Sequence, residues 1–204
     1  MTRRPVRIGI TGPIGCGKST VARWLGERPG VVVIDADWVA RDVLAPDTLE
    51  LEAVFARFGG ALRQADGALD RAALGRIVFS NPAALRDLEA IVHPAVRPRI
   101  LAAIEAAGAA DAAAVVIEAI KLVEGELADL CDEVWLVTCE PGAQLERLVA
   151  RGTVADDARE RIAAQGDLVT RLRPAATHII ETDGAPFMVR SHALDRLSAA
   201  LSVG

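Results

Sequence analysis

The sequence predicts an α/β fold with three layers and a five-stranded parallel sheet. An apolar run at Val6–Ile10 leads directly into a glycine-rich turn and then into a helical pattern. Further short apolar runs recur between longer helical patterns, at Val31–Ile34, Ala114–Ile117, Val134–Thr138 and His178–Glu181. Strands that alternate with helices in this way pair as parallel neighbours between two helical layers. The chain has 204 residues, so we expect one domain over residues 1–204 with a single substantial core.

The glycine-rich turn has the spacing of a phosphate-binding loop. It reads Gly12-Pro13-Ile14-Gly15-Cys16-Gly17-Lys18-Ser19 and is followed by Thr20. Its glycines allow backbone amides to converge on an anion at a helix N-terminus. We expect Lys18 to reach the β- and γ-phosphates and the Ser19 hydroxyl to bind Mg²⁺. The alternative is a turn that only joins a strand to a helix; the strand before it and the helical pattern after it favour the phosphate site.

Carboxylates follow two of the predicted strands. Val31–Ile34 is a continuous β-branched run, typical of a buried strand, and it ends at Asp35-Ala36-Asp37. Ligands of open α/β sheets bind outside the carboxyl ends of the strands, so Asp37 is a candidate base; if the strand geometry continues, Asp35 points to the same side. The alternative role for Asp37 is an N-cap for a helix that begins at Trp38. Glu118 ends the third strand and either binds Mg²⁺ through water or is a simple strand-end carboxylate.

Two helical regions lie outside the strand pattern. The first is an insertion at about residues 41–105, broken by turn signals that include Asn81-Pro82 and His93-Pro94. The second, at about residues 142–166, contains two helical pieces that carry arginines at positions 147, 151, 159 and 161. These arginines either form a solvated face or belong to a lid that brings cations to phosphates. In a lid, we expect their contacts to form only when nucleotide is bound.

Composition excludes several classes of protein. A net charge of -5 argues against general nucleic-acid binding. The three cysteines show no CxxC or zinc-ligand spacing, so we expect a reduced cytoplasmic protein. Cys16 lies among loop amides at a helix N-terminus, and we expect it to be the most reactive of the three thiols. No run of apolar residues is long enough for a membrane span or a signal peptide, so no membrane association is expected.

Three functions remain open at this point: a small-molecule kinase, a GTPase-like switch and an ATP-binding module without transfer. Guanine-specific proteins typically carry an Asn-Lys-x-Asp motif. The single asparagine, Asn81, precedes a proline in the helical insertion. The switch is therefore the weakest of the three.

An ordered set of short motifs resembles the dephospho-CoA kinase family. The set runs over nearly the whole chain: Ile8 to Ser19, Asp35-Ala36-Asp37 with Val39-Ala40-Arg41, Phe58-Gly59, Gly67-x-Leu69-Asp70-Arg71-x-x-Leu74 with Val78-Phe79, His93-Pro94-x-Val96, Gln144-x-x-Arg147, Arg161-Ile162-x-x-Gln165, and Gly184. The loop alone is generic, whereas the ordered set is specific.

The resemblance implies a P-loop kinase that transfers the γ-phosphoryl group of ATP, with Mg²⁺, to the ribose 3′-hydroxyl of dephospho-CoA. It implies that Asp37 is the catalytic base, with Lys18 and Arg147 on the phosphates, and that Gly184 lies at the adenine. The helical insertion then binds the CoA side, with Arg41 and His93 as contacts. Leu122, after the third strand, is a further contact, and the arginine-bearing lid closes over ATP. The resemblance is compatible with a monomer or a weak homo-oligomer.

Two segments depart from the family pattern. Of the usual Pro-Leu-Leu-Phe-Glu run after the third strand, the segment 118–124 keeps only Leu122 and Glu124. Near the end of the chain, Asp183 stands before Gly184 where the family usually has asparagine. We therefore expect adenine contacts to depend more on backbone groups.

Overall fold

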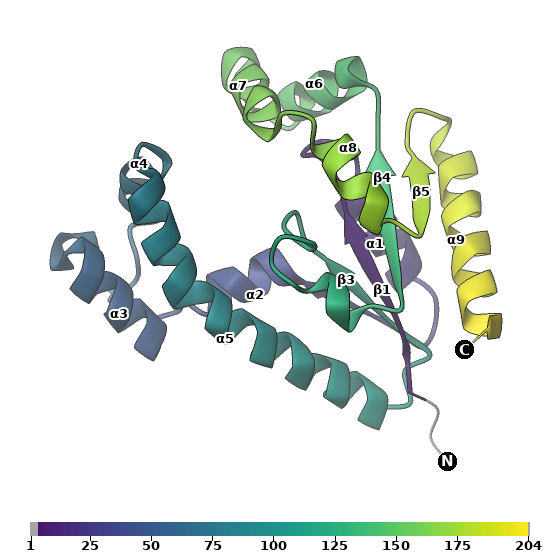
Figure 1. Ribbon diagram of the computed structural model, residues 1–204, viewed down its shortest axis with the longest axis horizontal. Helices are drawn as coiled ribbons and strands as arrows, with labels where there is room; N and C mark the ends of the chain where they lie inside the picture. Colours follow the sequence, from purple (N-terminus) through teal and green to yellow (C-terminus); the bar gives the residue numbers. More distant parts are fainter. Residues whose placement is uncertain (1–3, 204) are drawn as a thin grey trace. The chain divides into compact units, whose positions relative to one another are not determined.

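The computed structural model describes residues 4–203 and contains one five-stranded parallel sheet (Figure 1). Its strands are β1 (Val6–Thr11), β2 (Val31–Asp35), β3 (Ala114–Glu118), β4 (Glu133–Thr138) and β5 (His178–Glu181). The strand order is β2-β3-β1-β4-β5, so the strand that leads into the glycine-rich loop is central. The five predicted strands and the parallel sheet are confirmed.

α-Helices connect the strands, except between β3 and β4, where turns and a 3₁₀ turn make the connection. The helices are α1 (Lys18–Gly26), α2 (Ala36–Asp42), α3 (Leu49–Phe58), α4 (Arg71–Phe79), α5 (Pro82–Ala109), α6 (Pro141–Ala150), α7 (Ala155–Gln165), α8 (Leu168–Leu172) and α9 (Pro186–Val203), with 3₁₀ turns η1 (Gly60–Leu62), η2 (Ala128–Leu130) and η3 (Arg173–Ala175). Within residues 4–203, no helix is long and apolar enough to cross a bilayer.

The chain divides into two compact units. One comprises the residues up to Asp35 together with those from Ile104 onward, and it contains the sheet. The other comprises Ala36–Ala103 and is built from helices with one isolated antiparallel bridge, between Arg63 and Leu69. The second unit begins directly after β2, at the carboxyl end of a sheet strand.

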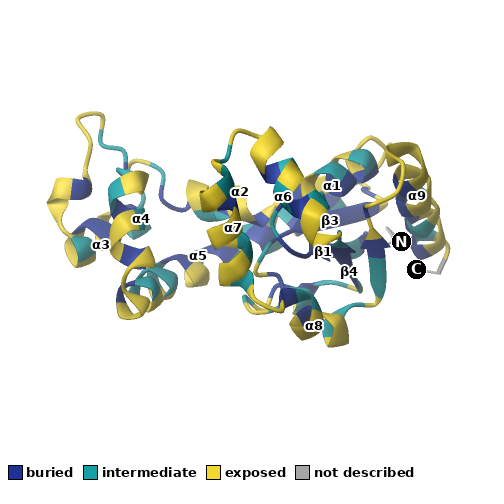
Figure 2. Cartoon of the chain, turned by 90° about the horizontal axis from the view of Figure 1, so that it is seen from above, coloured by how far each residue is buried: buried dark blue, intermediate teal, exposed yellow. Residues whose placement is uncertain are grey.

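The core of the sheet unit lies on both faces of the central strands. On one face α1 and α9 pack against β1 and β4, and Ile8, Leu25, Trp135 and Leu197 are all fully or almost fully buried there. On the other face Leu168 and Leu172 of α8 pack against Leu136. Figure 2 shows the strands as mostly buried and the outer surface of α9 as exposed. This packing fixes the carboxyl ends of β1, β3 and β4 as one rigid edge.

Strand β2 differs from the prediction, because it is not buried. Val32 and Val33 are 36% and 39% exposed, although the run Val31–Ile34 suggested a strand covered on both faces. The topology gives the reason, since β2 is an edge strand with a single neighbour, β3. In β3 all five residues are buried.

The predicted turn at His93-Pro94 is also wrong. Helix α5 continues through Pro94 and Pro98 without a break. Its buried residues Val92, Val96 and Ile100 recur at every fourth position, so one apolar face continues past both prolines. Proline removes one helical hydrogen bond, and here side-chain packing outweighs that loss.

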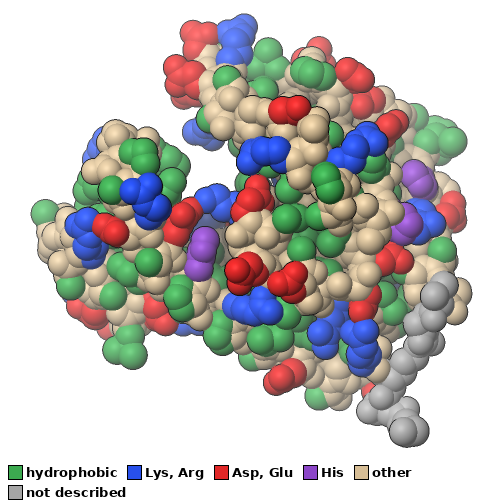
Figure 3. Space-filling view, viewed as in Figure 1, with side chains coloured by type: hydrophobic (Ala, Val, Ile, Leu, Met, Phe, Trp, Pro, Cys, Tyr) green, Lys and Arg blue, Asp and Glu red, His purple; other side chains and the backbone are tan. Residues whose placement is uncertain are grey.

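The unit 36–103 is stabilised by helix caps and exposed ion pairs. Thr48 accepts a hydrogen bond from the Leu51 amide at the start of α3, and Asp70 does the same for Ala73 at the start of α4. Arg63 pairs with Glu52 at 2.6 Å across the helices. Acidic and basic side chains are interspersed on the face seen in Figure 3. Exposed pairs of this kind contribute little each, about 0–1 kcal/mol.

Candidate active site

The loop after β1 has the geometry of a phosphate cradle. Gly12, Gly15 and Gly17 have φ values of 140°, 79° and 91°, which side chains rarely adopt, and Gly17 caps helix α1 in the left-handed region. A Cβ on Gly12 would lie 2.1 Å from the carbonyl oxygen of Val137, so glycine is required there for space as well. Glycine adopts these positive φ values without the strain that a side chain would cause.

Lys18 begins helix α1 and folds back over the loop. Its side chain is buried, and Nζ donates a hydrogen bond to the Pro13 carbonyl at 3.0 Å. A buried ammonium held on the loop's own backbone is already near the position at which phosphate oxygens would bind. The structure thus brings together all the loop residues that the sequence indicated, from Gly12 to Thr20.

Ser19 and Glu118 meet at the carboxyl ends of β1 and β3. The Ser19 hydroxyl donates to Glu118 Oε1 at 2.5 Å, although the two residues are 99 positions apart. The β2–β3 register places Asp35 opposite Glu118. Within the described residues no group of three or more His, Cys, Asp or Glu side chains could hold a metal by itself. One hydroxyl and one or two carboxylates fit Mg²⁺ that takes its remaining ligands from water and phosphate.

Asp37 lies in the first turn of α2. That helix begins at Ala36, directly after β2, so the strand geometry that would have aligned Asp35 with Asp37 does not continue. The N-cap explanation for Asp37 also fails, because an N-cap precedes its helix. A carboxylate in a first turn is favoured by the helix macrodipole, which is the structural alternative that remains.

Arg147 is anchored by the protein itself. Its guanidinium donates to Thr182 Oγ1 at 2.8 Å and to the Thr182 carbonyl at 2.6 Å. The Thr182 hydroxyl in turn lies 2.9 Å from the Cys16 carbonyl and 3.1 Å from that of Thr138, to one of which it donates. The expectation that the arginine contacts form only with nucleotide is therefore wrong for Arg147. Arg159, by contrast, pairs with Asp156 on the exposed face of α7.

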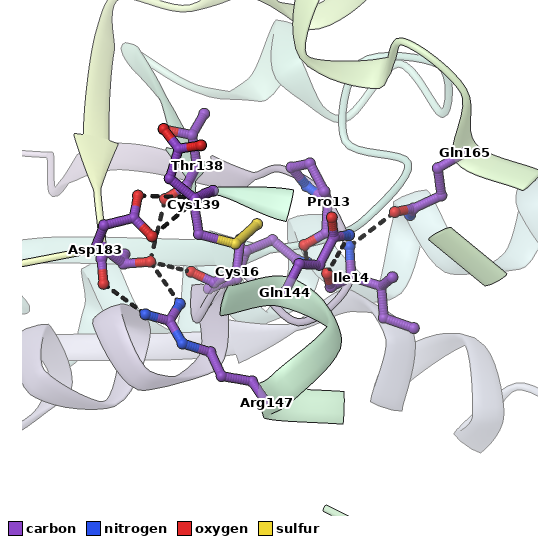
Figure 4. Close-up of a disulfide and its surroundings, with 12 residues drawn as sticks. Pro13, Ile14, Cys16, Thr138, Cys139, Gln144, Arg147, Gln165 and Asp183 are labelled. Atoms are coloured by element: carbon purple, nitrogen blue, oxygen red, sulfur yellow. Dashed lines mark hydrogen bonds between the residues drawn. A yellow bond between two sulfur atoms is a disulfide. The ribbon is translucent and has the colours of Figure 1, made fainter. Parts of the chain in front are cut away.

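Two further contacts join helices α6 and α7 to the loop. Gln144 donates to the Ile14 carbonyl, and Gln165 accepts from the Ile14 amide (Figure 4). At the start of α6, the Asp183 carboxylate accepts from the Glu140 amide at 2.9 and 3.0 Å. The side chain of Asp183 thus binds the backbone, and Gly184 next to it lines a cavity.

That cavity has a volume of about 180 Å³ and lies beside the loop. Its wall includes Gly17, Trp24, Arg151 and Gly184. The combination of apolar surface and cations suits a base and its phosphates.

Cys16 and Cys139 form a disulfide, which corrects the prediction of free thiols. Their Cα atoms are 5.1 Å apart although the two residues are 123 positions apart in the sequence, so only the folded sheet brings them together. Cys16 is fully buried, so it is not the most reactive thiol. Cys131 is free, and burial raises its pKa to about 12, which leaves it protonated and unreactive at neutral pH.

A second cavity, of about 270 Å³, lies within the unit 36–103. Trp38, Arg41 and Arg71 line it, and the Arg71 guanidinium donates to the Arg41 carbonyl at 2.8 Å. Burial and the neighbouring charge of Arg41 lower the pKa of Arg71. Two adjacent cations at a cavity are a site for an anion.

The other two predicted acceptor contacts have different surroundings. His93 is exposed, midway along α5. Leu122 is fully buried, and its side chain lies 2.6 Å from where a Cβ of Gly9 would be. A side chain without exposed surface cannot contact a ligand, so we do not propose Leu122 as an acceptor contact.

Sequence reasoning gave no role to Thr182, Cys139 or Asp183. Their partners are backbone groups, the distant Arg147 side chain and a distant cysteine, so no local spacing signals them. Gln144 and Gln165 were noticed only as parts of family motifs.

Comparison with known proteins agrees with this geometry. A family profile described as dephospho-CoA kinase matches residues 6–186. The chain belongs to the dephospho-CoA kinase family. It is 47% identical over 182 residues to a dephospho-CoA kinase of Synechococcus sp. (strain CC9605), covering 88% of this chain and 86% of that one. It is 46% identical over 159 residues to one from Geobacter metallireducens, covering 78% and 79%.

Solved structures share the fold, and one of them is a dephospho-CoA kinase. The Thermus thermophilus protein TT1252 superposes with a TM-score of 0.81 at 33% identity, covering 97% of this chain and 98% of that one. The dephospho-CoA kinase from Campylobacter jejuni gives a TM-score of 0.65 at 25% identity, with the same coverage. A shikimate kinase from Acinetobacter baumannii, at 19% identity and a TM-score of 0.56, shares the fold. The chain is therefore an enzyme of the P-loop kinase type.

Proposed function

We propose that this enzyme transfers the γ-phosphoryl group of ATP to the ribose 3′-hydroxyl of dephospho-CoA. The observation that carries the proposal is the complete phosphate cradle, with Lys18 folded over it and Ser19 joined to Glu118, in a chain of this family. The cradle supplies converging amides and a cation for the nucleotide phosphates.

Phosphoryl transfer needs cations around the moving group and a base for the acceptor. Lys18 neutralises charge on the β- and γ-phosphates, and Arg147, already oriented by Thr182, adds a second cation. Asp37 accepts the proton of the acceptor hydroxyl as its oxygen bonds to the γ-phosphorus. The bond from that phosphorus to the β–γ bridging oxygen breaks, and ADP leaves with the electron pair.

Ser19 and Glu118 would hold Mg²⁺, directly or through water. The ion, when bound, would neutralise charge on the β- and γ-phosphates. The hydrogen bond from the Ser19 hydroxyl to Glu118 keeps both oxygen ligands at the same edge of the sheet.

The acceptor is proposed to bind to the unit 36–103. Arg41 and Arg71 suit its diphosphate, and the exposed Trp38 and His93 are further candidates for contact. We propose that the enzyme acts as a monomer or a weak homo-oligomer and needs no nucleic acid.

The decisive experiment is an acceptor panel. Purified protein with ATP and Mg²⁺ is mixed with dephospho-CoA, adenosine, pantetheine phosphate or shikimate, and ADP release is measured. We expect release with dephospho-CoA and much less with the others. Faster release with another alcohol would reject the proposed acceptor, and release independent of any acceptor would indicate hydrolysis alone.

A further inference from the structure

A single residue of the phosphate loop is held on both of its peptide groups. The amide of Ile14 donates to Gln165 Oε1 at 2.9 Å, and its carbonyl accepts from Gln144 Nε2 at 2.7 Å (Figure 4). The two glutamines come from different helices: Gln144 from the middle of α6, and Gln165 from the last position of α7. Two separate helices thus converge on one loop residue.

The partners decide which end of each amide faces the loop. A backbone N–H can only be satisfied by the oxygen of Gln165, and a carbonyl only by the NH₂ of Gln144. Gln144 therefore acts as a donor and Gln165 as an acceptor. The same substitution at the two positions has opposite chemical consequences.

Helix α6 is seated directly on the loop at this point. A Cβ on Gly15 would lie 2.9 Å from the Gln144 carbonyl oxygen and 3.2 Å from its Cγ. Gln144 is only 7% exposed. One turn further along α6, Arg147 reaches the loop again through Thr182 and the Cys16 carbonyl. The helix is thus fixed at two loop residues, Ile14 and Cys16.

We infer that Gln144 and Gln165 are positioning residues that preset the phosphate loop for nucleotide. With both peptide groups of Ile14 held toward α6 and α7, the adjoining peptide planes are fixed before a ligand arrives. A preset cradle loses less conformational freedom when phosphate binds, so its affinity is higher. The inference rests on the proposed nucleotide site and does not depend on which alcohol is the acceptor.

Gln144→Glu and Gln165→Glu test the inference as a matched pair. Each adds one negative charge beside the loop, so each serves as the charge control for the other. A carboxylate at 165 still accepts from the Ile14 amide, whereas a carboxylate at 144 cannot donate to the Ile14 carbonyl. ATP affinity is measured by calorimetry without acceptor, and KM for ATP and for dephospho-CoA in the complete reaction. We expect the loss of ATP affinity at pH 8 to be about tenfold larger for Gln144→Glu than for Gln165→Glu. The first variant leaves the part-buried Ile14 carbonyl without its hydrogen-bond donor, whereas the second keeps the hydrogen bond from the Ile14 amide.

The pH profile supplies a readout that loss of folding would not give. As the pH falls, the carboxylate introduced by Gln144→Glu protonates and its hydroxyl becomes a donor, so the affinity of this variant relative to the parent should rise. The affinity of Gln165→Glu relative to the parent should rise much less over the same range, because a carboxylic acid still accepts through its carbonyl oxygen and only the effect of the added charge is removed. Gln144→Met and Gln165→Met each remove one of the two hydrogen bonds to Ile14 without adding charge. Each should weaken ATP binding and leave KM for dephospho-CoA near the parent value.

Gln64, which is exposed in the unit 36–103, gives a control outside the loop. Gln64→Glu should bind ATP as the parent does. Equal losses in Gln144→Glu and Gln165→Glu would mean that charge alone matters and would overturn the inference, as would parental affinity in both. If the parent enzyme bound ATP but did not transfer phosphate to dephospho-CoA, the proposed acceptor would be rejected. The inference about the two glutamines would still stand, because it depends only on ATP binding.

Discussion

The residues around the proposed nucleotide site and those around the proposed acceptor site are stabilised by different kinds of interaction. Around the phosphate loop, buried or half-buried groups from β3, α6, α7 and the segments after β4 and β5 contact the loop through hydrogen bonds and a disulfide. In the unit 36–103, Trp38 is 60% exposed, Arg41 is exposed, and the ion pairs are on the surface. The phosphate site is therefore organised before binding, whereas the acceptor side presents open cations and an aromatic face. Five predictions test this contrast, from the largest expected effect to the smallest.

Asp37→Asn should have the largest effect. The substitution removes the proposed base and keeps the size of the side chain, so kcat should fall by about 100- to 10,000-fold while ATP still binds. Steady-state kinetics and ATP calorimetry measure the two effects. Asp35→Asn is the control, with a much smaller expected loss. A helix-dipole role for Asp37 would instead give a small loss of stability and nearly parental turnover.

Reduction of the disulfide should weaken the nucleotide side. A disulfide typically contributes about 2–4 kcal/mol to the free energy of unfolding. Urea titrations with and without a thiol reductant should differ by that amount in the parent and in Cys131→Ser, and should coincide in Cys139→Ser. Three titratable thiols in the unfolded, unreduced protein would contradict the bridge.

Lys18→Ala should weaken nucleotide binding at least tenfold. It removes the loop's ammonium, and a hydrogen bond to a charged group contributes about 1.5–3 kcal/mol. Lys121→Ala removes the other lysine, which is exposed, and should change ATP affinity little. An unchanged KM for ATP in folded Lys18→Ala would refute the proposed phosphate contact.

Arg147→Ala should lower kcat/KM about tenfold and also destabilise the free enzyme. The side chain makes two hydrogen bonds to the buried Thr182, whose loss costs about 1–2 kcal/mol. Arg151→Ala, at an exposed position of the same cavity, should leave stability nearly constant. If the melting temperature without ligand were the same in Arg147→Ala and the parent, the anchoring by Thr182 would be unimportant.

Arg71→Ala should have the smallest effect and should affect only the acceptor. Removing one of two adjacent cations should raise KM for dephospho-CoA about three- to tenfold and leave KM for ATP unchanged. Because the pKa of Arg71 is lowered by burial and by Arg41, an anion that binds there relieves repulsion between the two. A rise in KM for ATP instead would contradict the assignment of this cavity to dephospho-CoA.

Local patterns were sufficient to predict the strands and the phosphate loop. The alternation from Val6 to Ile10, the glycine spacing and the apolar runs are signals within one segment. Ser19 and Glu118 were each candidate Mg²⁺ ligands from their own segments. Their hydrogen bond was not predicted, and it forms because β1, which leads into the loop before Ser19, pairs with β3, which ends at Glu118.

Features that depend on distant neighbours were not predictable in this way. The exposure of Val32 and Val33 follows from the edge position of β2, which its own residues do not encode. The pairing of Cys16 with Cys139 needs the finished sheet. The contacts of Gln144 with Ile14 and of Thr182 with Cys16 are to backbone groups, which every residue carries and no sequence pattern marks.

The disulfide also determines how the covalent chain is connected. The segment between Cys16 and Cys139 contains the whole unit 36–103, so that unit lies inside a closed ring of main chain. A protease that cuts once within this unit produces two fragments that still migrate as one molecule until a reductant is added. Two cuts release the excised piece, and what remains is a sheet unit whose halves are joined by the sulfur bridge at the phosphate loop.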